Sequence, residues 1–574
     1  MKKILTSLTF VLAFAVCSHG AYAGILKNPY LIYPGNNTTM QVLWQDTAIE
    51  ANNQLCWGTD TTYGTCVTVP ENNTTDNQHI FTITNLTPNT KYYYEVVDAT
   101  NGVYGTGSFL TAPAATATSV KFLGFGDTRT NPTAYDVVLA EMNKVIANDA
   151  GYQGLTVHAG DWVSTDGESY WTAEWFAPSL TDAITFRANS PINGVKGNHE
   201  NTNGYSTYYP KYYPFPYQSL TAKSGSTGVD LPYSNYWWSF DYGPVHFTII
   251  DQYSNDPVTG KLSYSVPSSA QTQWIINDLT AASANPNTPW KIVMYHEPAW
   301  TGGDHTDNVT TQQYLDPLIR QYGVDLVLAG HSHNYVRTGV WNSAQQNGDS
   351  IVMNVPYITS GGGGAPLGGV NLTNKSSWTH VIVADNDFNY STFNVNGKTL
   401  TMQSFQVNNA STSQIQPTTS SLIETLVLNQ FTDVTSQSSV ASTAFVYSRA
   451  TKLYTGNLTI TNNGPAALTG TIDVVLNGIL ALQNGSVAGV TNLNPSTADP
   501  NSKNNGNSAT TTIAANNGLI TNVTLVNATG QNNGAPMIQV STSGLAAGAS
   551  ITVPLQFTNP SNVPITFTPA VLQE

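Results

Sequence analysis

Five short motifs in this sequence carry the side chains best suited to chemistry, and apolar runs lead into most of them. The motifs are Gly126-Asp127, Gly160-Asp161, Gly197-Asn198-His199-Glu200, Val293-Met294-Tyr295-His296 and Gly330-His331-Ser332-His333. Together they offer two carboxylates, one amide oxygen and three imidazoles as metal ligands: Asp127, Asp161, Asn198, His296, His331 and His333. This mixed oxygen and nitrogen set suits two divalent or trivalent transition ions such as iron, manganese or zinc. A single His-x-His pair is a weak signal, so the predicted metal centre depends on all five motifs meeting at one place.

Short apolar strands must position these motifs. Strands are expected at Val120–Phe125, Leu155–His158, Lys291–Tyr295 and Asp325–Ala329, each ending at or just before one of the motifs. In open α/β sheets, ligands bind beyond the carboxyl ends of the strands. The glycines allow the backbone to turn sharply there, which frees the following side chain to face the site. The motifs are therefore expected to converge at strand ends.

Helices alternate with these strands. The sequence predicts helices from Asn131-Pro132 to about Asn148, at Ser269–Ala282 and at Thr311–Tyr322. A further strand is expected at Val245–Ile250, and aromatic strands from Trp378 to Val407. This alternation indicates an α/β layered domain, which we place at residues 118–412. His158, His246 and His380 lie in strand-like runs and are expected in the core or in support of the site. Glu200 either orients a neighbour or caps a turn.

Residues 24–113 precede this domain and alternate short strands with turns. Strands are expected at Met40–Trp44, Phe81–Thr84 and Tyr92–Val97, and this spacing favours a small β-sandwich. The stretch Asn85–Tyr94 resembles the late strands of a fibronectin type III domain. We therefore predict a fibronectin III-like domain over 24–113.

The C-terminal region, residues 420–574, lacks residues typical of a catalytic site, and no histidine follows His380. Strands are expected at Leu458–Thr461, Ile472–Leu476 and Ile551–Phe557, while Asn492–Ser508 reads as a long polar loop. The pattern favours a second, accessory β-sandwich. Association with a cell surface or matrix through this sandwich is an open expectation.

Residues 1–23 have the layout of a secretory signal peptide: Lys2 and Lys3, an apolar stretch, and Ala21-Tyr22-Ala23 as the cleavage site. A membrane span is the alternative, but the apolar run is too short for one. A lipid anchor at Cys17 is a further alternative. The prediction is a secreted protein, extracellular or periplasmic, with no membrane span.

The composition narrows the choice of partners. Losing Lys2 and Lys3 with the signal changes the net charge from -15 to -17, so nothing basic and continuous remains to neutralise a nucleic acid. Charged residues form only 10% of the chain, against roughly 25% in typical soluble domains. Cys56 and Cys66 are the two cysteines left after cleavage, and an even pair in a secreted chain suggests a disulfide, with two free thiols as the alternative.

The order of the five motifs resembles the calcineurin-like metallophosphoesterases, and the fibronectin-like domain in front makes it more similar to the purple acid phosphatase family. The stretches Asn334-Tyr335-Val336-Arg337 and Tyr357–Pro366 also resemble this family. The resemblance covers about residues 28–410 and leaves the C-terminal sandwich outside. It implies a four-layer α/β/β/α central domain with two bound metal ions, in a multidomain α/β plus β chain.

The resemblance also implies a role for each residue. Asp161 bridges both metals, Asp127 and His333 bind the first, and Asn198, His296 and His331 bind the second. His199 faces the phosphate together with Asn198. His305, nine residues after His296, contacts the substrate or protonates the leaving group.

The sequence departs from the family at two positions around the first metal. Purple members carry a tyrosine three residues after the second aspartate, where this chain has Ser164. Many other relatives carry a histidine two residues after the first aspartate, where this chain has Arg129. Water, Thr128 or Ser164 are the alternatives for the vacant ligand position, and Arg129 is a candidate to bind a phosphate oxygen, since a guanidinium suits bidentate contact.

The expected function is that of a binuclear phosphoesterase that hydrolyses phosphate monoesters, like an acid phosphatase. The resemblance implies direct attack by a metal-bridging hydroxide, with His199 or His305 as the proton donor to the leaving group. The substrate is a small phosphorylated molecule. A phosphodiesterase or nucleotidase with the same metals is one alternative, and a surface binding protein with a degenerate metal site is another. The natural substrate, the pH optimum and the oligomeric state stay open.

Overall fold

The structure is a computed structural model of the 574-residue chain. It describes residues 24–49, 52–72, 76–98, 102–201, 206–218, 221–223, 230–232, 235–303, 305–338, 355–370, 381–408, 419–482, 519–520, 523–532, 535–559 and 564–573. The predicted signal peptide, the loop Asn492–Ser508 and His380 lie outside the described residues. No helix within these ranges is both long and apolar enough to cross a membrane.

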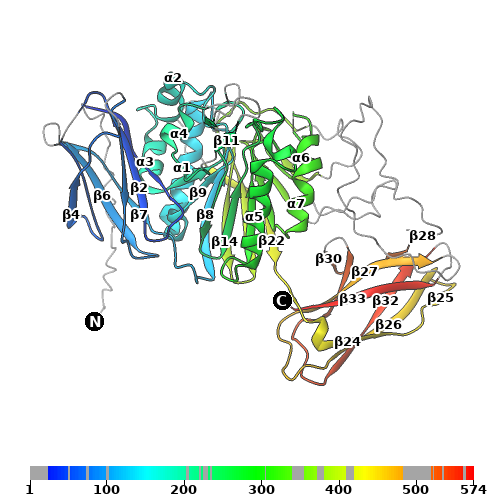
Figure 1. Ribbon diagram of the computed structural model, residues 1–574. Helices are drawn as coiled ribbons and strands as arrows, with labels where there is room; N and C mark the ends of the chain where they lie inside the picture. Colours follow the sequence, from blue (N-terminus) through cyan, green and yellow to red (C-terminus); the bar gives the residue numbers. More distant parts are fainter. Residues whose placement is uncertain are drawn as a thin grey trace, which may run out of the picture.

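The N-terminal region consists of two antiparallel sheets, drawn in blue in Figure 1. One sheet contains β1 (Ile25–Ile32), β2 (Met40–Asp46) and β5 (Gln78–Ile83); the other contains β4 (Thr65–Thr68), β3 (Asn53–Gly58), β6 (Lys91–Asp98) and β7 (Gly102–Leu110). Trp44, Tyr94 and Phe109 are buried in the core that the two sheets share. Cys56 and Cys66 are directly opposite one another on β3 and β4 and form a disulfide, as the sequence predicts.

Two larger sheets form the central region. The first has the strand order β10 (Ile192–Gly194), β9 (Thr156–His158), β8 (Ser119–Phe125), β20 (Asn389–Asn396), β21 (Thr399–Asn408) and β22 (Thr419–Asn429). The second has the order β13 (Trp238–Tyr242), β14 (Val245–Ile249), β15 (Trp290–Met294), β16 (Leu326–Ala329), β18 (Tyr357–Ser360), β17 (Tyr335–Thr338) and β19 (Val381–Asp385). Strands β8, β9 and β10 are parallel, as are β14, β15, β16 and β18. The carboxyl ends of each parallel set therefore lie at one edge of its sheet.

Helices cover the outer faces of these two sheets. Helices α1 (Pro132–Asn148) and α3 (Thr181–Asn189) lie on the side of the first sheet, and α5 (Ala270–Ala284), α6 (Val309–Tyr314) and α7 (Asp316–Gln321) on the side of the second (Figure 1). Between the sheets, the ring of Phe122 stacks on Phe393 at 4.5 Å and meets Phe247 edge-on at 5.3 Å. The arrangement is thus helix, sheet, sheet, helix.

The shorter elements are 3₁₀ helices at Ala150–Gly154 and Ser263–Ser265, α2 (Glu168–Tyr170), a π-helix at Trp171–Trp175, α4 (Tyr209–Tyr212), β11 (Thr221–Lys223) and β12 (Asp230–Pro232).

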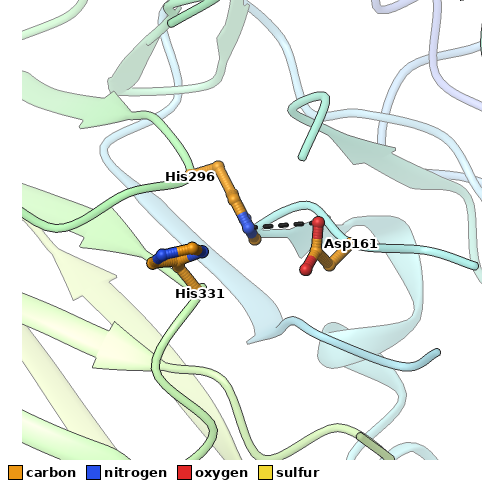
Figure 2. A group of neighbouring side chains, drawn as sticks. All are labelled: Asp161, His296 and His331. Carbon is orange, nitrogen blue, oxygen red and sulfur yellow. Dashed lines mark ion pairs between the residues drawn. The ribbon is translucent and has the colours of Figure 1, made fainter. Parts of the chain in front are cut away.

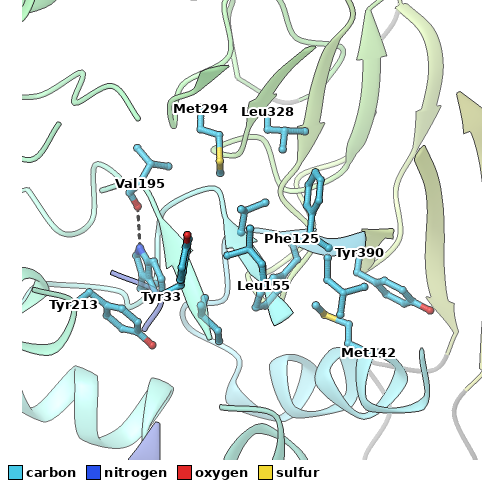
Figure 3. Packing of buried hydrophobic residues seen from close by; sticks show 14 of the residues in the cluster. Tyr33, Phe125, Met142, Leu155, Val195, Tyr213, Met294, Leu328 and Tyr390 are labelled. Atoms are coloured by element: carbon cyan, nitrogen blue, oxygen red, sulfur yellow. Dashed lines mark hydrogen bonds between the residues drawn. The ribbon is translucent and has the colours of Figure 1, made fainter. Parts of the chain in front are cut away.

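Some residues of the N-terminal region pack into the hydrophobic core of the central region. Tyr33 from the N-terminal region packs in the same cluster as Met142, Leu155 and Met294 (Figure 3). The backbone of Tyr33 exchanges two hydrogen bonds with the Asn193 side chain on β10: its N–H donates to Oδ1 at 3.1 Å and its carbonyl accepts from Nδ2 at 2.9 Å. The strand that leads into the third motif is therefore attached to the N-terminal region.

The predicted helices form, with one difference. The side chain of Asn131 caps α1 by accepting a hydrogen bond from the N–H of Ala134, and Pro132 begins the helix. The single helix expected at Thr311–Tyr322 is instead two short helices, which meet at Leu315. Pro317 stands at the start of α7, where its missing N–H costs no hydrogen bond, so the chain begins a new helix there.

The C-terminal region forms two sheets around a core that includes Leu458, Val474, Phe557 and Val571. One sheet contains β23 (Thr432–Asp433), β33 (Ile565–Gln573), β27 (Ile472–Leu482), β31 (Ala535–Ser541), β30 (Gly530–Asn532) and β28 (Leu519–Ile520); the other contains β24 (Ser438–Ser442), β26 (Leu453–Asn462), β32 (Ser550–Thr558), β29 (Thr524–Leu525) and β25 (Val446–Ser448), and a 3₁₀ helix lies at Thr435–Gln437. This region follows directly after β22 (Figure 1). The accessory β-sandwich and the domain limits 24–113, 118–412 and 420–574 remain predictions.

His246 on β14 is buried between two carboxylates. Its Nδ1 lies 2.7 Å from Oδ1 of Asp241, and its Nε2 lies 3.0 Å from Oδ2 of Asp278 on α5. Burial lowers the pKa of the His246 imidazole, but the hydrogen bonds and charges of the two carboxylates outweigh burial and raise the pKa to about 9. The folded state therefore holds the His246 proton more tightly than the unfolded chain does.

This interaction predicts how stability depends on pH. Because the folded pKa lies above the unfolded one, the stabilisation is complete below a pH of about 6.5 and is lost as the pH rises through about 9. Replacing His246 with Gln removes the titrating group. We expect the difference in free energy of unfolding between wild type and H246Q to shrink by on the order of 3 kcal/mol between about pH 6 and pH 10. Urea unfolding at several pH values measures this, and a difference that does not shrink would contradict it.

Candidate metal centre

All six predicted metal ligands lie beyond the carboxyl ends of parallel strands. Asp127 follows β8, Asp161 follows β9 and Asn198 follows β10; His296 follows β15, and His331 and His333 follow β16. The first three come from one sheet and the last three from the other. The edges of the two sheets meet here, which is why residues more than 200 positions apart come together, as His331 and Asp127 do.

The backbone is strained where it presents these side chains. Asp127, Asp161 and His331 have φ values of 58°, 55° and 69°, in the left-handed region that residues other than glycine rarely adopt. Gly330 has a different task from the one expected, because a Cβ at this position would overlap the Asp127 carboxylate. The glycine permits close approach, and the following residue carries the strain.

One group of ligand atoms comes from Asp161, His296 and His331 (Figure 2). Nε2 of His296 lies 3.1 Å from Oδ1 of Asp161 and 3.1 Å from Oδ1 of Asn198. Nδ1 of His331 lies 3.0 Å from the same Asn198 oxygen. Four side chains thus offer two oxygen and two nitrogen atoms to one point.

A second group contains Asp127, Asp161 and His333, the residues that the resemblance assigns to the first metal. Nε2 of His333 lies 3.7 Å from Oδ1 of Asp127, and both oxygens of Asp127 accept hydrogen bonds from the backbone N–H of His331 at 2.9 and 3.0 Å. Asp161 belongs to both groups. Its Oδ1 faces His296, and its Oδ2 faces Arg129. This is the position expected for a bridging carboxylate.

Backbone carbonyls fix the tautomers of two of the histidines. Nδ1 of His296 donates to the carbonyl of Ala159 at 2.7 Å, and Nδ1 of His333 donates to the carbonyl of Pro366 at 2.8 Å. In each ring, Nε2 is left to face the carboxylates. Metal-binding histidines are characteristically oriented in this way by a hydrogen bond from the other ring nitrogen.

The charges in the centre favour a bound cation. Burial raises the pKa of the Asp127 carboxyl well above its usual value. Burial also acts on Asp161, but the neighbouring charge of His296 outweighs it and holds the pKa of Asp161 well below its usual range. In turn, the carboxylates overcome burial and raise the pKa of His296 to about 10, while burial lowers the pKa of His331 to about 2. Two buried carboxylates thus draw positive charge into the site.

The residues of the first group fit a transition ion, because two imidazoles, a carboxylate and an amide oxygen converge on one point, and the Ala159 carbonyl sets the tautomer of His296. The second group offers three donors among the described residues. The two hydroxyls that the sequence suggests for its vacant position each donate a hydrogen bond to a neighbouring oxygen, and their role as ligands stays a prediction. Thr128 Oγ1 donates to the carbonyl of Trp162 at 3.0 Å, and Ser164 Oγ donates to Oε2 of Glu174 at 3.0 Å.

Glu200 orients its neighbours. Its buried carboxylate accepts hydrogen bonds from the backbone N–H groups of Asp161 at 3.1 Å, Val163 at 3.0 Å and Gly197 at 2.9 Å. Burial, aided by the charge of Asp161, raises the pKa of Glu200 to about 8, although the hydrogen bonds from Val163 and Gly197 oppose the change. The carboxylate therefore ties the second motif to the third.

Both histidines predicted to act on the substrate lie at the centre. Nδ1 of His199 donates to the carbonyl of Ser164 at 2.7 Å, which leaves Nε2 3.8 Å from Oδ2 of Asp161. His305 lies over His331, with ring centroids 4.0 Å apart, and 6.2 Å from the ring of His333. Both are only partly buried, so they line the side of the centre that faces solvent.

Arg129 also reaches the centre. Its Nε donates to Oδ2 of Asp161 at 3.2 Å, and its Nη2 lies 3.2 Å from Nε2 of His333. Sequence reasoning placed it near the substrate but gave no reason to expect contact with two metal ligands. The sequence also gave no signal for Glu174, which organises the loop around Arg129 and lies in an aromatic stretch.

A buried ion pair that the sequence analysis missed supports the third motif. Nζ of Lys196 lies 3.3 Å from Oδ2 of Asp251 and 4.1 Å from the centre of the Tyr236 ring. Both charged side chains are fully buried. A lysine at the end of an apolar run, immediately before Gly197-Asn198, is the signal that could have revealed it.

The family comparisons agree with this geometry. Residues 120–335 match the calcineurin-like phosphoesterases, a range that contains all five motifs. The fold and the centre thus define a calcineurin-like phosphoesterase domain. Residues 26–111 match the purple acid phosphatase N-terminal domain. The chain therefore contains both domains that the resemblance implied, and the predicted resemblance to the purple acid phosphatases is confirmed.

Two curated relatives illustrate the range of the match. Acid phosphatase A of Cryphonectria parasitica is 24% identical over 377 residues, which cover 54% of this chain and 74% of that protein. Purple acid phosphatase 23 of Arabidopsis thaliana is 26% identical over 311 residues, which cover 50% of this chain and 62% of that protein. The chain spans only 60 to 62% of the length of several curated relatives. A solved structure of PhoD has a TM-score of 0.50 at 13% identity, covering 72% of this chain and 91% of that chain, and supports the fold alone.

Proposed function

We propose that the protein is a secreted, metal-dependent phosphoric ester hydrolase that acts on phosphate monoesters. The observation that carries the proposal is the convergence of Asp127, Asp161, Asn198, His296, His331 and His333 at the carboxyl ends of strands from two sheets. The family match supports it, and so do the curated relatives named as acid phosphatases. Secretion rests on the signal-like residues 1–23.

Residues of this chain have distinct tasks in the proposed reaction. A bound transition ion supplies positive charge for the phosphate oxygens and lowers the pKa of water. Asp161 and His296 hold that charge in a buried, rigid position, so little reorganisation accompanies the reaction. The Nε2 of His199 and the ring of His305 face the solvent side, where either is placed to give a proton to the departing alkoxide.

Hydrolysis of a substrate panel tests the proposal. The full chain, depleted of metal and then reloaded with manganese, zinc or iron, is assayed with p-nitrophenyl phosphate, bis(p-nitrophenyl) phosphate and a nucleotide. We expect metal-dependent hydrolysis with the monoester as the best substrate. Preference for the diester or the nucleotide would instead favour a phosphodiesterase or nucleotidase. A protein that binds no metal and hydrolyses none of the three would favour a surface binding protein with a degenerate site.

Two other expectations remain predictions. Edman sequencing of secreted protein that begins at Gly24 would support cleavage of residues 1–23. Association of the C-terminal region with a cell surface has no support in the described residues.

A further inference from the structure

Arg129 occupies a position between two ligands of the second group. Its Nε donates to Oδ2 of Asp161 at 3.2 Å, and its Nη2 lies 3.2 Å from Nε2 of His333. The Arg129 side chain is 17% exposed. The guanidinium therefore lies among the ligand atoms of the second group.

The Nε2 lone pair of His333 cannot serve both Arg129 and a metal ion. Nδ1 of His333 carries its proton toward the Pro366 carbonyl, so Nε2 has a single lone pair, and this lone pair faces Nη2 of Arg129. Oδ2 of Asp161 faces Nε of the same guanidinium. An ion bound by Asp161 and His333 would need both acceptors, and it would lie against a side chain that keeps its positive charge at any accessible pH. The observed guanidinium and a metal ion in the second group exclude one another.

The loop around Arg129 is built to hold this side chain in place. Nη1 of Arg129 donates to Oγ1 of Thr130 at 3.0 Å. Thr130 has a φ of 72°, a strained conformation for a β-branched residue. Its N–H donates to Oε2 of Glu174 at 2.9 Å, and its hydroxyl is 2.8 Å from that of Ser164, which also donates to Glu174. Glu174 therefore stabilises the backbone that directs Arg129 into the centre.

Ser164 and Arg129 stand at the two positions where the sequence departs from the family, and both contribute to this arrangement. Ser164 stands where purple members have a tyrosine, and its hydroxyl is hydrogen-bonded to Thr130 and Glu174. Arg129 stands where many other relatives have a histidine. The changes are linked, because Ser164 helps to hold the residue that fills the group.

We infer that Arg129 takes the place of one metal ion and that the chain binds a single transition ion, at Asp161, Asn198, His296 and His331. This inference deepens the proposed function and rests on it for the role of the centre in phosphate binding. Three of the five guanidinium N–H groups face Asp161, Thr130 and His333, so two remain to donate to oxygens of a bound phosphate. The fixed charge of Arg129 thus replaces the charge of the missing ion.

Metal stoichiometry tests the inference without reference to activity. The full chain, depleted of metal and checked for folding by circular dichroism, is titrated with Zn²⁺ by calorimetry, and bound metal is counted by mass spectrometry. We expect one ion in the wild type and two in R129H, because the imidazole adds a ligand to the second group. R449A removes one positive charge from an exposed turn of the C-terminal region and is expected to bind one ion, as the wild type does.

The outcomes separate the inference from the proposed function. Two ions in the wild type, or a single ion in a folded R129H protein, would overturn the inference and leave a metal-dependent hydrolase possible. No ion in the folded wild type would overturn both. Anomalous diffraction from zinc-soaked crystals gives an independent count: one peak beside His296 supports the inference, and a second peak beside Asp127 contradicts it.

Discussion

Replacing Asp161 with Asn is expected to reduce hydrolysis of p-nitrophenyl phosphate by roughly a thousandfold or more. The carboxylate faces His296 with Oδ1 and Arg129 with Oδ2, so one substitution removes the charge that holds both sides of the centre together. The amide keeps the size of the side chain and one oxygen. The fold is therefore expected to remain intact while metal binding and activity are lost.

Steady-state kinetics and metal analysis of the folded D161N variant measure this effect. H331A is expected to give a similar loss, because His331 contributes to the group that already includes Asn198 and His296. D60N, which removes an exposed carboxylate outside the centre, is the matched control and should retain activity. Wild-type activity in D161N or H331A would contradict the assignment of the centre.

Replacing Glu200 with Ala has the second large effect that we expect, and it concerns stability. The carboxylate accepts hydrogen bonds from three buried backbone N–H groups, of Asp161, Val163 and Gly197. Each buried donor left without a partner costs about 1–3 kcal/mol, so the free energy of unfolding is expected to fall by about 3–5 kcal/mol.

E200Q separates hydrogen bonding from side-chain volume. The amide oxygen can still accept from part of this set, but the NH₂ group must face a backbone donor, so we expect a loss of about 1–2 kcal/mol. Denaturant unfolding of wild type, E200Q and E200A measures the order. Equal stability of the wild type and E200A would show that Glu200 only caps a turn.

The sequence predicted those parts of the centre that depend on local patterns. Asp127 and Asp161 each follow an apolar strand and a glycine, and the carboxyl ends of parallel strands meet at a sheet edge whatever the rest of the chain does. Helix α1 was predicted to the residue at its start because Asn131-Pro132 is a local signal. Such features need no knowledge of distant contacts.

Features that depend on contacts between distant segments could not be predicted. Glu174 acts on Thr130 across 44 positions, and no motif marks it. The vacant ligand position had three candidates in the sequence, water, Thr128 and Ser164, because each was chemically reasonable. The hydrogen bonds that Thr128 and Ser164 donate to Trp162 and Glu174 exist only in the folded chain, so the sequence could not predict them. The break at Leu315, in contrast, had a local signal, because Pro317 would lie inside the single helix expected at Thr311–Tyr322 and disfavours a continuous helix there.

The hydrogen bonds between Tyr33 and Asn193 limit how far the chain is modular. Asn193 lies five positions before Asn198, on the strand that carries the third motif, and Tyr33 belongs to the core cluster that also contains Leu155 and Met294. The N-terminal sheets are therefore a structural part of the domain that holds the site, and they cannot be exchanged independently of it. Scanning calorimetry should show these two regions melting in one transition, and swapping the N-terminal sheets for those of a relative would require the Tyr33 and Asn193 positions to be exchanged as a pair.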